Sequence, residues 1–177
     1  KPGERIYSVR FMQNRAYIVT FQKVDPLYSI DLSNLDDPKI AGQLEIPGFS
    51  DYLHPVGDDL LIGVGKGAIT GESGTTWYQG IKVALFNVAD VANPIELNVI
   101  DIGKRGSHTA LAYDHHAFTG LDVDGIFRFA FPISVNDGEA RGDYWRDPES
   151  QFYEWRHSGL HLFEIENNQL INSGAII

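Results

Sequence analysis

The sequence contains no cysteine, and this absence removes several kinds of chemistry at once. Without thiols the chain has no disulfide framework, no cysteine nucleophile and no cysteine-rich zinc site. Cysteine-free chains occur in both reducing and oxidising compartments, so this absence does not indicate where the protein works.

Long apolar runs and an excess of positive charge are also missing. No stretch approaches the roughly 20 apolar residues that cross a bilayer as a helix, and no charged-then-apolar leader opens the chain, so we predict no transmembrane segment within it. Fourteen Lys and Arg stand against 24 Asp and Glu, which gives a formal net charge of -10 at pH 7. Nucleic acid and anionic membranes are repelled by such a chain, whereas basic or neutral partners and cations remain open. The chain begins Lys1-Pro2 without a methionine, so we expect it to be part of a longer protein.

The apolar residues that are present mostly alternate with polar ones in short runs. Examples are "IYSVRF", "RAYIVTF", "LYSIDL", "KVALFNV" and "GLHLFEI", separated by Gly, Pro, Asn and Asp. A period of two is typical of half-buried strands, and no stretch combines a 3.6-residue period with helix caps. With 177 residues and 43% hydrophobic content, the chain can bury the core of one domain. The sequence therefore predicts an all-β protein.

The strands repeat along the chain. "LYSIDLSNLDDPKIAGQLEI" (27–46) aligns with "VALFNVADVANPIELNVIDI" (83–102), and "LHLFEIENNQLINSGAII" (160–177) is a shorter third copy. A second hairpin precedes each copy, and repeated four-stranded antiparallel units are the signature of β-propeller blades. We predict a single partial propeller domain over 1–177 with about three such blades, at about 5–49, 50–106 and 107–177. Rings close with roughly 4 to 8 blades, so we expect the end blades to pair with missing blades or with a second copy.

Several of these segments also resemble a known family. They are "GERIYSVRFMQNRAYIVTFQKVDPLYSIDL", "IPGFSDYLHPVGDDLLIGVG", "GIKVALFNVADVANP", "YDHHAF" and "GLHLFEIE". Together they resemble the β-propeller domain of uncharacterised bacterial secreted or envelope proteins, over nearly the whole chain apart from an insert around 136–155. The resemblance implies a propeller in an extracytoplasmic setting and no established activity. The family pattern has Lys where this chain has His116, which disfavours any scheme that needs both adjacent histidines.

The long connections should gather on one face of such a propeller. Residues 65–80 and 135–159, with the passages 47–51 and 103–114, join strand 2 to strand 3 or one blade to the next. Long loops on a rigid β scaffold usually carry recognition. Trp145 and Tyr153 lie among charges there and are candidate contacts for a protein or a glycan. The alternative is that these loops cover the channel or pack on an absent part of the protein.

A second candidate site comes from the inner strands. Aligning "YSVRF", "YLHPV" and "YDHHA" as inner strands puts Arg10, His54 and His115 near one level at the channel mouth, where they could bind a small anion. The two imidazoles could instead hold a divalent metal together with Asp51 and Asp114. The plainer alternative is a set of polar side chains satisfied by neighbouring carbonyls and channel water.

"YDHHAFTG" (113–120) is predicted as the inner strand of the third blade. Successive side chains of a strand point to opposite faces, so His115 and His116 cannot both face the channel. A chelate made by these two adjacent residues is therefore disfavoured.

The function predicted from these features is that of a non-catalytic binding scaffold of the cell envelope. Its long-loop face would engage a protein, a glycan or a small anionic ligand, and no cofactor is predicted. The alternative is an envelope hydrolase or lyase with a site of His54, His115 and nearby carboxylates, which a metal could assist. A third hypothesis is an assembly module in which two copies form a six-bladed ring.

Overall fold

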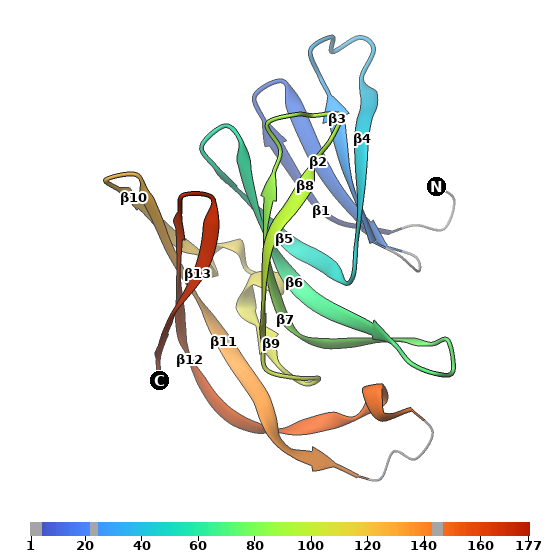
Figure 1. Cartoon of the computed structure of the whole chain (residues 1–177), viewed down its shortest axis with the longest axis vertical. Coiled ribbons are helices and arrows are strands. Elements are labelled where there is room, and N and C mark those ends of the chain that lie inside the picture. Colours follow the sequence, from blue (N-terminus) through green and yellow to red (C-terminus); the bar gives the residue numbers. More distant parts are fainter. Residues whose placement is uncertain (1–4, 22–24, 143–146) are drawn as a thin grey trace.

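A computed structural model describes residues 5–21, 25–142 and 147–177 (Figure 1). The first four-stranded antiparallel sheet contains β1 (Arg5–Met12), β2 (Arg15–Phe21), β3 (Asp25–Asp31) and β4 (Lys39–Ile46). The second contains β5 (Phe49–Val56), β6 (Leu60–Thr70), β7 (Thr76–Asn87) and β8 (Ile95–Ile102). The third contains β10 (Thr119–Val123), β11 (Ile126–Arg141), β12 (Phe152–Glu166) and β13 (Gln169–Ile176), with β9 (His108–Thr109) paired to β11. The prediction of an all-β chain with three four-stranded blades is confirmed.

Helical structure in the described residues is confined to three short 3-10 turns. They are η1 (Ala110–Ala112), η2 (His115–Ala117) and η3 (Pro148–Ser150). None of the helices in the described ranges has the length and apolar character needed to cross a membrane.

The strands of each sheet follow one another in space as they do in sequence, and the three sheets do not close into a ring. Figure 1 shows the short turns of the β1–β2, β3–β4, β5–β6 and β7–β8 hairpins at one end of the molecule. The β6–β7 connection and the adjoining ends of β11 and β12 lie at the opposite end, which we call the long-connection end. This is the distribution that the strand order predicts for a propeller.

A bulge recurs in the outermost strand of every sheet. One residue is left without a partner in each outer pair: Ala41 in β4, Leu97 in β8 and Ser173 in β13. Ala41 and Leu97 occupy the same position in the aligned sequence repeats. A bulge adds local twist to its strand, so the three outer hairpins repeat in geometry as well as in sequence.

The hydrophobic core has two layers, with β7 between them. Val83 and Leu85 belong to the cluster shared with the third sheet, while Ala84 and Phe86 belong to the cluster shared with the first. Because both faces of β7 are buried, "KVALFNV" reads as an almost continuous apolar run.

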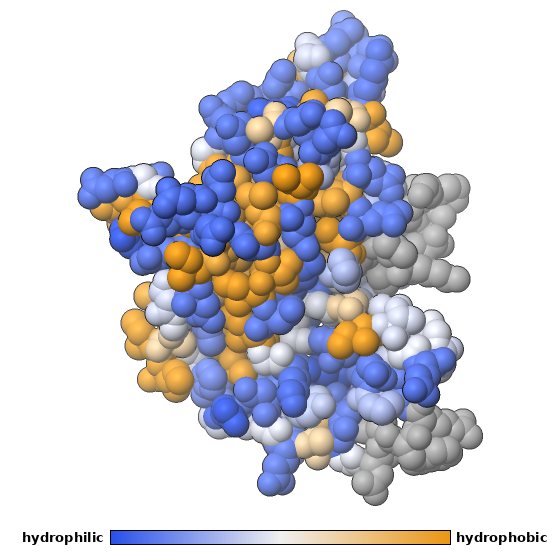
Figure 2. Space-filling model, in the orientation of Figure 1, coloured by the Kyte–Doolittle hydropathy of each residue, from blue (hydrophilic) through white to orange (hydrophobic). Residues whose placement is uncertain are grey.

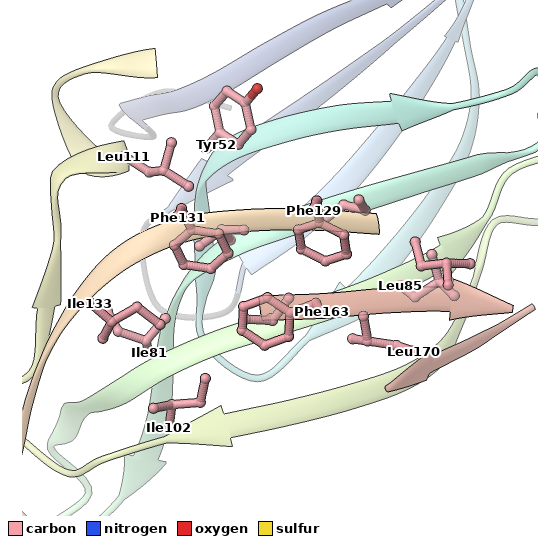
Figure 3. Packing of buried hydrophobic residues seen from close by; sticks show 14 of the residues in the cluster. Tyr52, Ile81, Leu85, Ile102, Leu111, Phe129, Phe131, Ile133, Phe163 and Leu170 are labelled. Atoms are coloured by element: carbon pink, nitrogen blue, oxygen red, sulfur yellow. The ribbon is translucent and has the colours of Figure 1, made fainter. Parts of the chain in front are cut away.

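Stacked phenylalanine rings dominate the layer between the second and third sheets (Figure 3). The Phe163 ring centre lies 5.0 Å from that of Phe129 and 5.2 Å from that of Phe131. Figure 2 shows apolar side chains gathered where β8 and β13 lie in Figure 1. The core between these sheets therefore continues to the molecular surface along their outer strands.

Polar side chains of the first sheet bind backbone carbonyls of the second. The Ser8 hydroxyl donates to the Ser50 carbonyl at 2.7 Å, and the Arg15 guanidinium donates to the Val88 carbonyl at 2.6 Å. Such bonds satisfy the polar groups that the packed sheets bury and fix the position of one sheet on the other.

The segment "YDHHAFTG" does not form the inner strand that the sequence predicts. The Asp114 side chain accepts from the His116 backbone N–H at 3.0 Å, and residues 115–117 turn as η2 before β10 begins at Thr119. Aspartate offers this local bond in place of a sheet ladder. The innermost strand of the third sheet is therefore β10.

Candidate functional site

Three of the predicted site residues meet around the Tyr52 ring. Tyr52 and His54 lie two residues apart on β5, and the Tyr52 hydroxyl is 3.0 Å from the His54 Nδ1 atom. The Arg10 guanidinium carbon lies 5.7 Å from the centre of the Tyr52 ring, and the His115 ring centre lies 5.0 Å from it in a T-shaped arrangement. We call these four residues the Tyr52 cluster.

The members of this cluster arrive by different routes. Arg10 reaches across from β1 and donates through Nε to the Leu53 carbonyl at 2.8 Å. His115 comes from η2, where its side chain is exposed, and not from an inner strand. Tyr52 was not among the predicted site residues, although residues two apart on a strand share a face and His54 was already a candidate.

The His54 imidazole is held between aromatic rings. Its centre lies 4.2 Å from that of Phe118 and 5.7 Å from that of Phe127, with the planes nearly parallel. Burial, together with the charge of Arg10, lowers the pKa of His54 to about 4. The imidazole is therefore neutral at neutral pH, so Arg10 supplies the fixed positive charge next to the Tyr52 ring.

The carboxylates predicted beside these histidines, Asp51 and Asp114, do not join them in one metal-binding group. Asp51 sits in the bulge of β5, where burial raises its pKa to about 6 and the charge of Lys66 opposes that rise. A backbone hydrogen bond from His116 lowers the pKa of Asp114. Within residues 5–21, 25–142 and 147–177, no three His, Asp or Glu side chains form a group that could hold a metal ion. The predicted set of two histidines with these two aspartates is therefore not brought together.

At the long-connection end, the two long hairpins bind one another. Asp147 Oδ2 accepts from the Ser73 hydroxyl at 2.7 Å and from Trp77 Nε1 at 2.6 Å, and only 6% of Asp147 is exposed. The Gln79 amide donates to the Glu149 carbonyl at 2.9 Å. We call these contacts the hairpin clamp. In it the indole N–H of Trp77 binds Asp147, so the polar edge of this ring has a structural role.

Arg105 extends this clamp with its planar guanidinium. The guanidinium carbon lies 4.9 Å from the Trp77 ring centre and 4.4 Å from the Phe152 ring centre, which is a cation–π arrangement on both sides. One guanidinium nitrogen donates to the Tyr78 carbonyl at 3.3 Å. Nothing in the periodicity of the sequence singled out Arg105 or Asp147, because both act through distant segments.

Tyr153 and Trp145 were the predicted contact residues at this end. Tyr153 is half-buried, its backbone N–H donates to the Arg105 carbonyl at 3.1 Å, and the Lys104 ammonium lies 4.3 Å from its ring centre. Trp145 lies outside the described residues. Phe152 and Trp155 are exposed at 43% and 58%.

Comparison with known proteins gives a family and two archaeal relatives. Residues 1–177 match the family model described as a beta propeller domain. An uncharacterized protein of Methanocaldococcus jannaschii is 47% identical over 96% of this chain and 28% of its own length. An uncharacterized protein of Archaeoglobus fulgidus is 40% identical over 70% of this chain and 18% of its own length. No solved structure matches the chain.

Both relatives are archaeal, so these matches do not support the bacterial origin that the resemblance implied. The chain spans less than a third of the length of either relative. An extracytoplasmic location stays a prediction.

Proposed function

The chain belongs to the beta propeller domain family, and from this premise we propose that it is a non-catalytic binding scaffold of the cell envelope. Its ligand, a protein or a glycan, would be recognised at the long-connection end. A second class of ligand would be a small anion, bound beside Arg10 in the Tyr52 cluster.

The observation that carries this proposal is the pairing of the hairpin clamp with exposed aromatic rings. Asp147 binds Ser73 and Trp77, and Arg105 stacks on Trp77 and Phe152, so the described parts of the two long hairpins are joined without any ligand. Phe152 and Trp155 are exposed on the β12 side of that clamp. Rigid aromatic side chains give a large contact area at low entropy cost, which suits protein and glycan recognition.

Substitution of the exposed rings tests this proposal. We expect Phe152→Ala combined with Trp155→Ala to weaken binding of the chain to an immobilised glycan panel or to isolated archaeal envelope proteins by about tenfold or more. Phe11→Ala removes an exposed ring from β1, near the short-turn end, and serves as the matched control. Binding that depends equally on all three rings, or on none, would contradict the proposal.

A second candidate role is assembly into a larger propeller. Phe11, Ala16, Ile30 and Ile40 are direct neighbours across β1 to β4 and make an apolar row on the face of the first sheet that points away from the second. On the third sheet, Leu160 and Ile176 are paired and partly or largely exposed. We propose that further blades of a longer protein cover these faces, which fits the greater length of both relatives.

If further blades cover these faces, a substitution there should change the melting temperature only when the neighbouring blade is present. Ile40 is 68% exposed here, so Ile40→Lys should leave the melting temperature of the 177-residue chain nearly unchanged. In a longer chain that includes the preceding blade, the same substitution should lower it by several degrees because a charge is buried. Leu35→Lys, in the β3–β4 turn and 80% exposed, is the control. Equal effects of Ile40→Lys in both chains would contradict this role.

A further inference from the structure

A hollow of about 400 Å³ lies at the long-connection end, on the face of the second sheet that looks toward the first. Lys82 lies on this face because it is two residues before Ala84 on β7, and residues two apart on a strand share a face. Ala84 packs against the first sheet. Three glycines border the hollow: Gly67, Gly80 and Gly103. A Cβ atom at Gly67 would approach Asp101 Oδ1 to 3.3 Å and Gln79 Cβ to 3.9 Å, and both residues line the hollow, so glycine at this position helps to leave the hollow open.

The charges inside the hollow are partly paired. Lys82 is almost fully buried, with 7% of its side chain exposed, and its ammonium lies 2.8 Å from the Glu96 carboxylate and 3.1 Å from the Pro47 carbonyl. Lys82 is therefore already neutralised and uses two of its three N–H donors. An incoming anion would have to displace Glu96 from it.

The hollow is lined by two ammonium groups, of Lys82 and Lys104, and by two carboxylates, of which Glu96 pairs with Lys82 and Asp101 is the other. Asp101 is the direct cross-strand neighbour of Lys82 on β8, and its side chain is exposed. Among the described residues, no hydrogen bond or ion pair engages its carboxylate. Lys104 also borders the hollow, but its ammonium lies 4.3 Å from the Tyr153 ring centre. Together with the second Glu96 oxygen, Asp101 makes the hollow attractive to a cation, as does the overall charge of -10.

The rest of the lining is apolar. Ala68, Ile69 and Val99 border the hollow, and the last two are partly exposed to it and to solvent. A methylene chain can bury its surface against these side chains while its charged end stays near the carboxylates.

We propose that this hollow binds the protonated amine of an alkyl chain. The ammonium lies between Asp101 and Glu96, and the methylene stem lies against Ile69 and Val99. A free diamine and a lysine side chain of a partner polypeptide share this chemistry. The inference rests on the proposed binding function of the long-connection end and names a ligand class for it.

The test is an NMR titration of the isotope-labelled chain with three probes. They are 1,5-diaminopentane, Nα-acetyl-lysine N-methylamide, and the matched Nα-acetyl-norleucine N-methylamide, which has the stem but no amine. We expect the two amines to shift the backbone amides of Gly67, Gly80 and Gly103 in a saturable way, more weakly at high salt. The norleucine probe should not saturate. A tighter diamine indicates a free ligand, and a tighter lysine probe indicates a polypeptide.

Asp101→Asn should weaken binding of the amines by about twofold to fivefold, as expected for an exposed ion pair. Asp122→Asn removes the same charge from exposed β10 and should leave binding unchanged. Both variants should keep the melting temperature of the parent chain, which checks their folding. Equal shifts from the norleucine probe, equal losses in the two variants, or no saturable shift with either amine would overturn the inference.

Failure of this test is distinguishable from failure of the proposed function. If no amine binds while loss of Phe152 and Trp155 still abolishes glycan or protein binding, only the amine site is wrong. If the amines bind at the three glycines while the aromatic substitutions change nothing, the proposed recognition by Phe152 and Trp155 is wrong.

Discussion

Replacing His54 with phenylalanine should change how the stability of the protein depends on pH. The phenyl ring keeps the stacking on Phe118 but cannot take up a proton. In the parent chain, burial holds the pKa of His54 at about 4, against 6.5 for an exposed histidine. As the pH falls from 6.5 to 4, the unfolded chain binds a proton that the folded chain does not. The free energy of unfolding therefore falls across this range. The full difference in pKa corresponds to about 3 kcal/mol, but the imidazole is only partly buried and solvent screens its charge, so we expect a fall of about 1 to 2 kcal/mol.

The assay is urea unfolding of both proteins at pH 7, 5.5 and 4, followed by circular dichroism. Relative to the parent, the free energy of unfolding of His54→Phe should rise by about 1 to 2 kcal/mol between pH 7 and pH 4. His116→Phe, at a fully solvent-exposed side chain, controls for the loss of an imidazole as such. A difference between the parent and His54→Phe that stays within about 0.5 kcal/mol at all three pH values would refute the reasoning.

Two further substitutions test other parts of the fold. Burial raises the pKa of Asp51 to about 6, so the carboxylate that predominates above that pH is less stable in the folded chain than in the unfolded chain. Asp51→Asn should therefore raise the free energy of unfolding at pH 8 by about 1 to 2 kcal/mol, and a lower value in urea unfolding would contradict this. That gain should disappear by pH 4, because the folded parent then carries a proton on Asp51. Phe131→Ala opens a cavity beside Phe129 and Phe163 and should cost about 3 to 5 kcal/mol in the same assay, whereas Leu121→Ala, at an exposed site, should cost under about 0.5 kcal/mol.

The strands and their repeat could be predicted because both depend on patterns of residues that are close together in the sequence. Alternation in "RAYIVTF" reflects side chains that point to opposite faces of one strand, and Pro38 and Pro94 mark equivalent turns. The prediction that residues 113–120 form the inner strand of the third blade was wrong, and the reason is equally local. The cap that Asp114 provides to η2 competes with a strand, and the pattern of apolar residues does not report such a bond.

The candidate site was only partly predictable. Alignment of the inner segments brought Arg10, His54 and His115 together, although His115 reaches Tyr52 from η2. The hairpin clamp could not be predicted, because Asp147 binds side chains about 70 residues away in sequence. Contacts of this range depend on how the sheets pack, and a single sequence carries no pattern that reports them.

The bulge repeated in β4, β8 and β13 bears on how the molecule avoids unwanted association. Each of these strands is the outer edge of its sheet, and a regular edge offers free N–H and C=O groups to a strand from another molecule. The unpaired residues Ala41, Leu97 and Ser173 interrupt the spacing of those groups at one level of every blade. A fifth strand could not continue the ladder in register, so each blade ends at four strands and lateral aggregation through the rim is disfavoured.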